Sequence, residues 1–234
     1  MSTANVWNGA TSVIPPSTKE ALVLTAERLF ALHGLDGVSL RQICEAAGTR
    51  NNSAVQYHFG GKESLVQAIL EYRIPAIAQR RRLLVAQVSP DDLRSVIEAH
   101  LLPTVELAES PDSYYATFLE QLQEYSLDEH PFTRLPETLQ THHHDYIRSV
   151  QRLLDEIPEP IRTTRIMQAA AISVHASAER ERRRHHGTAL PGFAVHMNNL
   201  FDGLEGFLRA PVSTATLTAL NTARAGSRTR SSQA

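Results

Sequence analysis

Side chains that could recognise nucleic acid are concentrated in one stretch of this chain, between Val38 and Lys62. From Asn52 to His58 nearly every residue carries an amide, a hydroxyl, an aromatic phenol or an imidazole, and Val55 is the one large aliphatic exception. Core packing explains this composition poorly, because so little of it is apolar. Amides can pair with base edges in the major groove of DNA, and hydroxyls and cations can hold phosphates. The composition therefore favours contact with double-stranded DNA.

Two short helices joined by a turn would position these side chains. Ser39 and Gln42 have the spacing of a capping box, which predicts a helix that begins at Leu40. Gly48 is expected to end this helix, because glycine readily adopts the left-handed conformation common at helix C-termini. A polar turn and a second helix from about residue 52 to 58 would follow, and a further helix would begin at Lys62.

The order of these elements resembles the DNA-binding domain of the tetracycline-repressor (TetR) family, over roughly residues 18–72. Three runs match together and in register: Ala46-Ala47-Gly48, Tyr57-His58-Phe59 and Lys62-Glu63-Ser64-Leu65. The chain departs from the usual pattern by one extra residue between Gly48 and Tyr57. It also has Gly61 where the family usually has a better N-cap residue, which predicts a slightly weaker cap.

The resemblance implies a role for each polar residue of this region. Ser39, Tyr57 and Lys62 would hold phosphates, and Lys62 would be helped by the free backbone N–H groups at its helix start. Asn52, Ser53 and Gln56 lie where base contacts occur, and Arg41 or Arg50 could make either contact. The complete predicted DNA-contacting set is Ser39, Arg41, Arg50, Asn51, Asn52, Ser53, Gln56, Tyr57, His58 and Lys62.

The remainder of the chain predicts further helices and no strand. A scaffold helix is expected over 18–33, and Pro75 should kink the helix from Lys62 or mark a change of helix. Proline and glycine punctuation predicts later helices over 91–109, 112–128, 136–157, 159–185 and 191–209. The fold class is therefore all-α, with an N-terminal three-helix helix-turn-helix domain (18–62) and a larger helical effector-binding and dimerisation domain (63–210). Residues 1–17 and 211–234 are expected to be a disordered arm and tail.

The charge distribution agrees with a DNA-facing front and a body that faces elsewhere. Residues 19–88 hold nine Lys/Arg and six Asp/Glu, a charge of +3, whereas residues 89–210 hold eleven and nineteen, a charge of −8. Ordinary surface variation could also produce this asymmetry. The run Arg80-Arg81-Arg82 lies beyond the expected DNA surface and is predicted to be a solvated face.

The residues offer little support for catalysis or for a metal. His142-His143-His144 is the one tract that suggests metal binding, but adjacent histidines on a helix diverge by about 100°. No cysteine or well-spaced acid completes a tetrahedral set, so no metal or cofactor is expected. The sequence has no Gly-rich phosphate loop, no nucleophile elbow and no His-Glu-x-x-His motif, which predicts a protein that is not an enzyme.

An effector pocket and a homodimer are implied by the resemblance. The last two predicted helices would form a four-helix interface with a second subunit, although their apolar stripe could equally meet the chain's own core. The interface residues would be Ala170, Val174, Ser177, Met197, Leu200, Phe201, Leu204 and Leu208. A mostly apolar small molecule would be bound among His100, Tyr114, Tyr115, Phe118, Leu122, His143, Tyr146 and His175.

The leading hypothesis is a homodimeric transcription regulator that binds a near-palindromic DNA operator and is released by a small-molecule effector of unknown identity. The alternative is a helical small-molecule-binding protein or enzyme with a vestigial helix-turn-helix. Cys44 is the one cysteine, so no internal disulfide can form, and a reducing cytoplasm is expected. No apolar run approaches the about 20 residues of a membrane-spanning helix, so no membrane association is expected.

Overall fold

The computed structural model describes residues 17–49, 54–124 and 131–231, and within them the chain is all helical with no strand. The prediction for residues 1–16 lies outside the described residues. In chain order the elements are α1 (Thr18–His33), α2 (Leu40–Ala46), α3 (Ala54–Phe59), α4 (Lys62–Val85), α5 (Leu93–Leu107), α6 (Tyr115–Glu124), the 3₁₀ turn η1 (Pro131–Arg134), α7 (Glu137–Leu153), α8 (Ile161–His185), α9 (Phe193–Arg209) and α10 (Thr214–Ser231).

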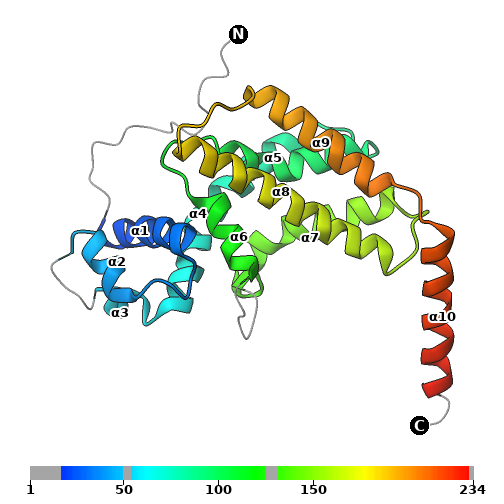
Figure 1. Ribbon diagram of the computed structural model, residues 1–234, viewed down its shortest axis with the longest axis horizontal. Coiled ribbons are helices and arrows are strands. Elements are labelled where there is room, and N and C mark those ends of the chain that lie inside the picture. The colour runs from blue at the N-terminus through cyan, green and yellow to red at the C-terminus, as the bar shows by residue number, and fades with distance from the viewer. Residues whose placement is uncertain (1–16, 50–53, 125–130, 232–234) are drawn as a thin grey trace.

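Helices α1, α2 and α3 form a small domain at one end of the molecule (Figure 1). Both predicted helix starts carry capping boxes: Ser17 with Glu20 begins α1, and Ser39 with Gln42 begins α2. Gly48 adopts a φ of +70°, the conformation for which a glycine was expected after α2. Apolar side chains from all three helices pack with the first half of α4 in one buried cluster, which includes Phe30, Ile43, Val55 and Leu65.

Helix α4 joins this domain to the body. Its 24 residues span about 36 Å, and it is continuous through Pro75. The predicted change of helix at Pro75 is therefore wrong. Pro75 is exposed, so the ring and the missing N–H lie on the solvent side, where water can satisfy the freed carbonyl. Gly61 precedes α4 without a side-chain cap, as expected for this residue.

Helices α5 to α9 form the body around a second buried cluster, in which α5, α7, α8 and α9 contribute residues such as Ile97, Val150, Ile166 and Phe201. Helix α8 packs against both α6 and α9, and α8 and α9 lie together on the near face of the body in Figure 1. These helices begin one to three residues later than predicted, because the preceding proline or aspartate segments remain outside the helix.

The prediction of a disordered C-terminal tail is wrong, because α10 extends from Thr214 to Ser231. The Ser213 hydroxyl accepts from the backbone N–H of Thr216 at 3.2 Å and thereby caps the helix start. In Figure 1, α10 projects away from the body beyond the end of α9. A search of the described residues found no helix long and apolar enough to cross a membrane.

Candidate functional site

Helix α3 presents most of its side chains to solvent. Val55 is fully buried and anchors the helix to the domain core, whereas Gln56, Tyr57 and His58 are exposed. The phenol ring of Tyr57 is 81% exposed and contacts the His58 imidazole edge-on, with 5.0 Å between ring centroids. An aromatic side chain this exposed on a helix whose other face is buried has no role in the core, and it is available to a partner.

Two of the predicted DNA-contacting side chains are engaged by the protein's own backbone. The Gln56 amide donates to the carbonyl oxygen of Gly60 at 2.8 Å, which satisfies a group at the end of α3. The Lys62 ammonium donates to the carbonyl oxygen of Leu35 at 2.7 Å, across the interface between α4 and the loop after α1. A contact from either side chain to DNA would replace or share one of these bonds.

The predicted contacts on α2 are also partly committed. The Ser39 hydroxyl accepts from the backbone N–H of Gln42 at 3.3 Å and donates to its side-chain oxygen at 2.8 Å. The Arg41 guanidinium donates to the Glu45 carboxylate one turn later at 2.8 Å, and both side chains are well exposed. This exposed pair can be exchanged for a phosphate at small cost. The remaining predicted contacts, Arg50, Asn51, Asn52 and Ser53, lie outside the described residues.

The prediction that Arg80-Arg81-Arg82 is a solvated face is wrong for two of the three residues. Arg80 makes a bidentate ion pair with Glu106 of α5, at 2.7 and 2.9 Å, and both partners are largely buried. Arg81 donates from Nε to the carbonyl oxygen of His100, also on α5, at 3.0 Å. Only Arg82 is exposed, so the run chiefly serves to join α4 to the body.

The eight residues predicted to bind the effector are separated by the structure. Tyr115, Phe118 and Leu122 are buried in the core cluster that α6 shares with α1 and α4. The His175 side chain is 70% exposed on α8 and is paired with Glu120 at 2.6 Å. Core packing or solvent exposure already accounts for the positions of these four residues, and their role in ligand binding stays a prediction. Helical periodicity could not separate a side chain at a core from one at a cavity.

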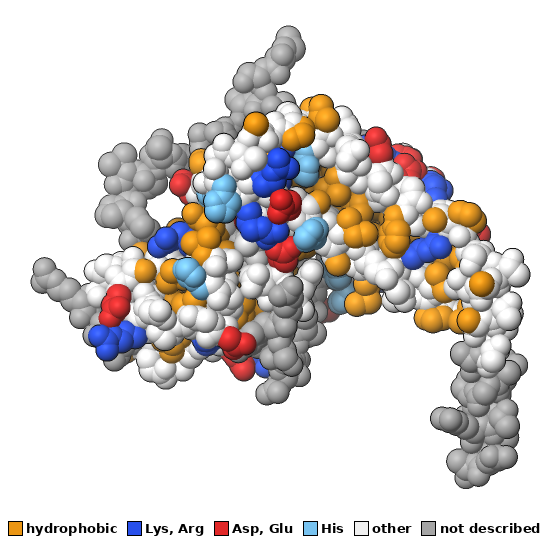
Figure 2. Space-filling view, in the orientation of Figure 1, with side chains coloured by type: hydrophobic (Ala, Val, Ile, Leu, Met, Phe, Trp, Pro, Cys, Tyr) orange, Lys and Arg blue, Asp and Glu red, His pale blue; other side chains and the backbone are white. Residues whose placement is uncertain are grey.

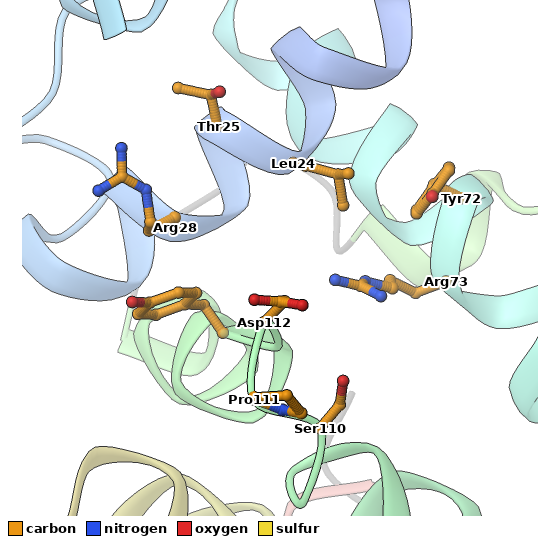
Figure 3. Close-up of a pocket in the computed structure, with 9 residues that line it drawn as sticks. Leu24, Thr25, Arg28, Tyr72, Arg73, Ser110, Pro111 and Asp112 are labelled. Atoms are coloured by element: carbon orange, nitrogen blue, oxygen red, sulfur yellow. The ribbon is translucent and has the colours of Figure 1, made fainter. Parts of the chain in front are cut away.

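Tyr114 lines a pocket of about 430 Å³ between the small domain and the body (Figure 3). Arg28 of α1 and Tyr72 of α4 form two of its sides, and Asp112 from the segment before α6 lies between Arg28 and Arg73 in this view. The full lining is Leu24, Thr25, Arg28, Tyr72, Arg73, Ser110, Pro111, Asp112 and Tyr114. A molecule bound here would contact both parts of the chain. Apart from Tyr114, these residues were not predicted, since their helices meet only in the tertiary structure.

The other three predicted ligand residues, His100, His143 and Tyr146, form an aromatic cluster between α5 and α7. The His100 and Tyr146 rings are stacked, with centroids 3.7 Å apart and planes 4° from parallel. The His143 ring lies 5.7 Å from that of His100. The structure places these three predicted residues side by side, and their role in ligand binding stays a prediction. The sequence analysis did not identify Arg81, which reaches the cluster from α4.

Charge and burial shift the pKa values of this cluster. Burial lowers the pKa of Arg81 to about 10, and no carboxylate pairs with it among the described residues. Burial, followed by the charge of Arg81, lowers the pKa of His143. Burial raises the pKa of Tyr146, so its phenol remains protonated.

A second buried titratable group connects α8 to α6. Glu181 is fully buried, and its Oε2 accepts from the backbone N–H and the hydroxyl of Thr117 at 2.9 and 2.7 Å. Its Oε1 has no hydrogen-bond partner among the described residues. Burial raises the pKa of Glu181 to about 7, although the bonds from Thr117 oppose this shift.

The apolar stripe predicted to meet a second subunit faces mainly inward. Five of the predicted interface residues are buried within the single chain: Ser177, Leu200, Phe201, Leu204 and Leu208. Their role in an interface stays a prediction. Ala170, Val174 and Met197 are half-buried.

The outward face of α8 and α9 carries a different apolar set. Met167 and Val195 are 67% and 64% exposed, and Ile172 is 43% exposed. Gly203 and Gly206 leave open space where a side chain would stand. Figure 2 shows hydrophobic side chains gathered over these two helices.

No group of His, Cys, Asp or Glu side chains that could hold a metal ion occurs in the part of the chain that the structure describes. Within the histidine tract, His143 belongs to the aromatic cluster and the exposed His144 lies beside it, with 6.3 Å between ring centroids.

Residues 18–69 match the family of bacterial regulatory proteins described as the tetR family. The transcriptional repressor AcnR of Corynebacterium efficiens is 37% identical over 60 residues, 26% of this chain and 31% of that protein. The repressor KstR2 of Rhodococcus jostii is 32% identical over 112 residues, 48% of this chain and 53% of that protein. The chain thus spans from about a third to about half of the length of these relatives.

The fold extends further than the sequence similarity. A crystal structure of AibR, in complex with isovaleryl coenzyme A and operator DNA, superimposes over 84% of this chain and all of that one. The TM-score is 0.51 and the sequence identity is 16%. This similarity concerns the arrangement of helices in both the small domain and the body.

Proposed function

We propose that this chain, which belongs to the tetR family of bacterial regulatory proteins, is a ligand-responsive transcriptional regulator that binds a DNA operator as a homodimer. The observation that carries the proposal is the surface of α3. Its buried Val55 fixes the helix to a packed domain, and its exposed Gln56, Tyr57 and His58 form a polar surface that the core does not need. Amide and phenol groups on such a helix suit base edges and phosphates in a major groove.

The direction of regulation that we propose is repression, because AcnR and KstR2 are both named as transcriptional repressors. A twofold dimer through the outward face of α8 and α9 would carry two copies of α3. In a near-palindromic operator these would enter major grooves about 34 Å apart, or somewhat further.

The effector would act by favouring one of two conformations of the dimer. Helix α4 would transmit this change to the DNA-binding domain, because it begins there and is joined to α5 further along. Arg80 pairs with Glu106, and Arg81 donates to the carbonyl oxygen of His100. A small molecule bound in the body can lower the affinity for DNA by no more than the difference between its own affinities for the two conformations. AibR is a solved example that holds a small molecule and operator DNA together.

Fluorescence anisotropy with DNA from upstream of the chain's own gene, against scrambled DNA over a salt series, tests the proposal. We expect selective binding of at least about 10³ over scrambled DNA. Gln56→Ala should reduce specific more than nonspecific binding, whereas Lys62→Ala should weaken both and flatten the salt slope by about one unit. Equal effects of both substitutions on every sequence would contradict the assignment of Gln56 to base reading.

A further inference from the structure

The side chain of Arg81 is half-buried between α4 and α5, and no carboxylate pairs with its guanidinium among the described residues. Its Nε donates to a backbone carbonyl, that of His100, and no hydrogen bond or ion pair involves its two terminal nitrogens within the described chain. The neighbouring Arg80 and Arg73, on the same helix, both have carboxylate partners. A half-buried cation without a counter-ion lowers stability, because the cost of desolvating it is not offset by an ion pair.

A second polar group at this place also lacks a partner. Tyr146 of α7 is 5% exposed, and its hydroxyl is sealed from solvent with no hydrogen-bond partner in the described chain. Its ring is stacked on His100, whose carbonyl accepts from Arg81, so the phenol and the guanidinium converge on the same residue. A protonated phenol and a guanidinium are both hydrogen-bond donors, so what the pair lacks is an acceptor that carries negative charge.

We propose that Arg81 and Tyr146 form the anion-binding end of an effector site, and that its ligand is a small organic acid held by its carboxylate. A planar carboxylate can accept two parallel bonds from a guanidinium and one more from a phenol. The flat His100 and Tyr146 rings and the adjoining apolar cluster would pack against the hydrocarbon part of the acid. His143, at the edge of the cluster, is exposed to solvent.

The position of Arg81 connects this site to DNA binding. Arg81 lies 19 residues after Lys62 on one continuous helix, about 28 Å along its axis. A carboxylate between Arg81 on α4 and Tyr146 on α7 would tie α4 to the body at the end opposite the DNA-binding domain. The regulatory part of this inference rests on the proposed function, whereas the binding part does not.

Two pairs of matched probes test the binding part with the full-length protein and no DNA: benzoate with benzamide, and hexanoate with hexanamide. Isothermal titration calorimetry and thermal unfolding should show binding of at least one acid and weaker binding of its amide by about tenfold or more. Arg81→Met should abolish the difference between acid and amide. Arg82→Met, at the exposed neighbouring position, should leave it unchanged.

Tyr146→Phe is a second variant that keeps the fold. Because the hydroxyl that it removes has no partner, the melting temperature of the free protein should be unchanged or higher. The affinity for the acid should fall by about tenfold. NMR titration of the imidazoles gives an independent readout: the bound acid should raise the pKa of His143, because it offsets the charge of Arg81.

Failure to bind either acid, or equal binding of acid and amide, would overturn the proposal. Retained discrimination in Arg81→Met would do the same, since it would place the carboxylate elsewhere. Operator binding is measured separately by anisotropy. If DNA binding is selective but the acids do not bind, this inference fails and the proposed function stands. If the acids bind through Arg81 but DNA does not, the proposed function fails and the binding site stands.

Discussion

The carboxylate of Glu27 on α1 accepts from Nε and Nη2 of Arg73 on α4, at 2.7 and 2.8 Å, in a buried bidentate ion pair. The same carboxylate also accepts from the backbone N–H of Tyr114, at 3.2 Å, at the start of α6. One side chain therefore joins the DNA-binding domain, the connecting helix and the body. Its two partners, Arg73 and Tyr114, line the pocket of Figure 3 together with Asp112.

We expect Glu27→Ala to lower the free energy of unfolding by about 3–5 kcal/mol, because it leaves Arg73 buried and unpaired. Urea denaturation followed by circular dichroism measures this change. Glu45→Ala is the matched control: it removes an exposed partner of Arg41 and should cost less than about 1 kcal/mol. Similar losses for both variants would mean that burial does not govern the contribution of these pairs.

Glu181 should make stability depend on pH. Its pKa is raised from 4.5 to about 7 in the folded chain, so between these values the folded state holds more protons than the unfolded state. The free energy of unfolding should therefore fall as pH rises through this window, by up to about 3 kcal/mol.

Glu181→Gln cannot ionise, and its unfolding curve should lack this decline between pH 5 and 8. Thermal melts of wild type and variant at several pH values measure the difference. Glu179→Gln, on the exposed side of the same helix, should retain the wild-type pH dependence. An unchanged decline in Glu181→Gln would assign it to another group.

The outward face of α8 and α9 should mediate dimerisation. Met167→Lys places a charge at the most exposed apolar position of α8 and should weaken the dimer by at least about tenfold, because an unpaired charge would be buried in the interface. Sedimentation equilibrium measures the dissociation constant. Val85→Lys replaces an equally apolar residue that is 55% exposed at the end of α4, and it should leave the dimer intact. A dimer unaffected by Met167→Lys would rule out this face.

Lys62 and Tyr57 should differ in how they affect stability. Lys62→Ala removes the bond to the Leu35 carbonyl and should lower the free energy of unfolding by about 1–2 kcal/mol, in addition to weakening DNA binding. Tyr57→Ala should change stability by less than about 0.5 kcal/mol, because the ring is mostly exposed, yet reduce DNA affinity. Chemical denaturation and anisotropy on the same preparations separate the two effects. A stability loss in Tyr57→Ala that equals that of Lys62→Ala would contradict the exposed position of the ring.

The sequence by itself determined the elements that depend on local signals. The capping boxes of Ser17 with Glu20 and of Ser39 with Gln42 each act over three residues, and Gly48 ends α2 because glycine readily adopts a positive φ. The exposed polar face of α3 was also visible, because seven residues with one large aliphatic side chain can bury little. These features need no knowledge of distant parts of the chain.

The tertiary structure alone decided which side of each long helix faces the core. The stripe on α9 that includes Phe201 and Leu204 is apolar enough for either a core or a partner, and the packing against α5 and α8 assigned it to the core. Arg81 was predicted to be part of a solvated run, because nothing in the sequence reveals that α5 and α7 pack against α4 at this position. Pairings such as Glu27 with Arg73, 46 residues apart, depend on the three-dimensional path of the chain, which no local pattern specifies.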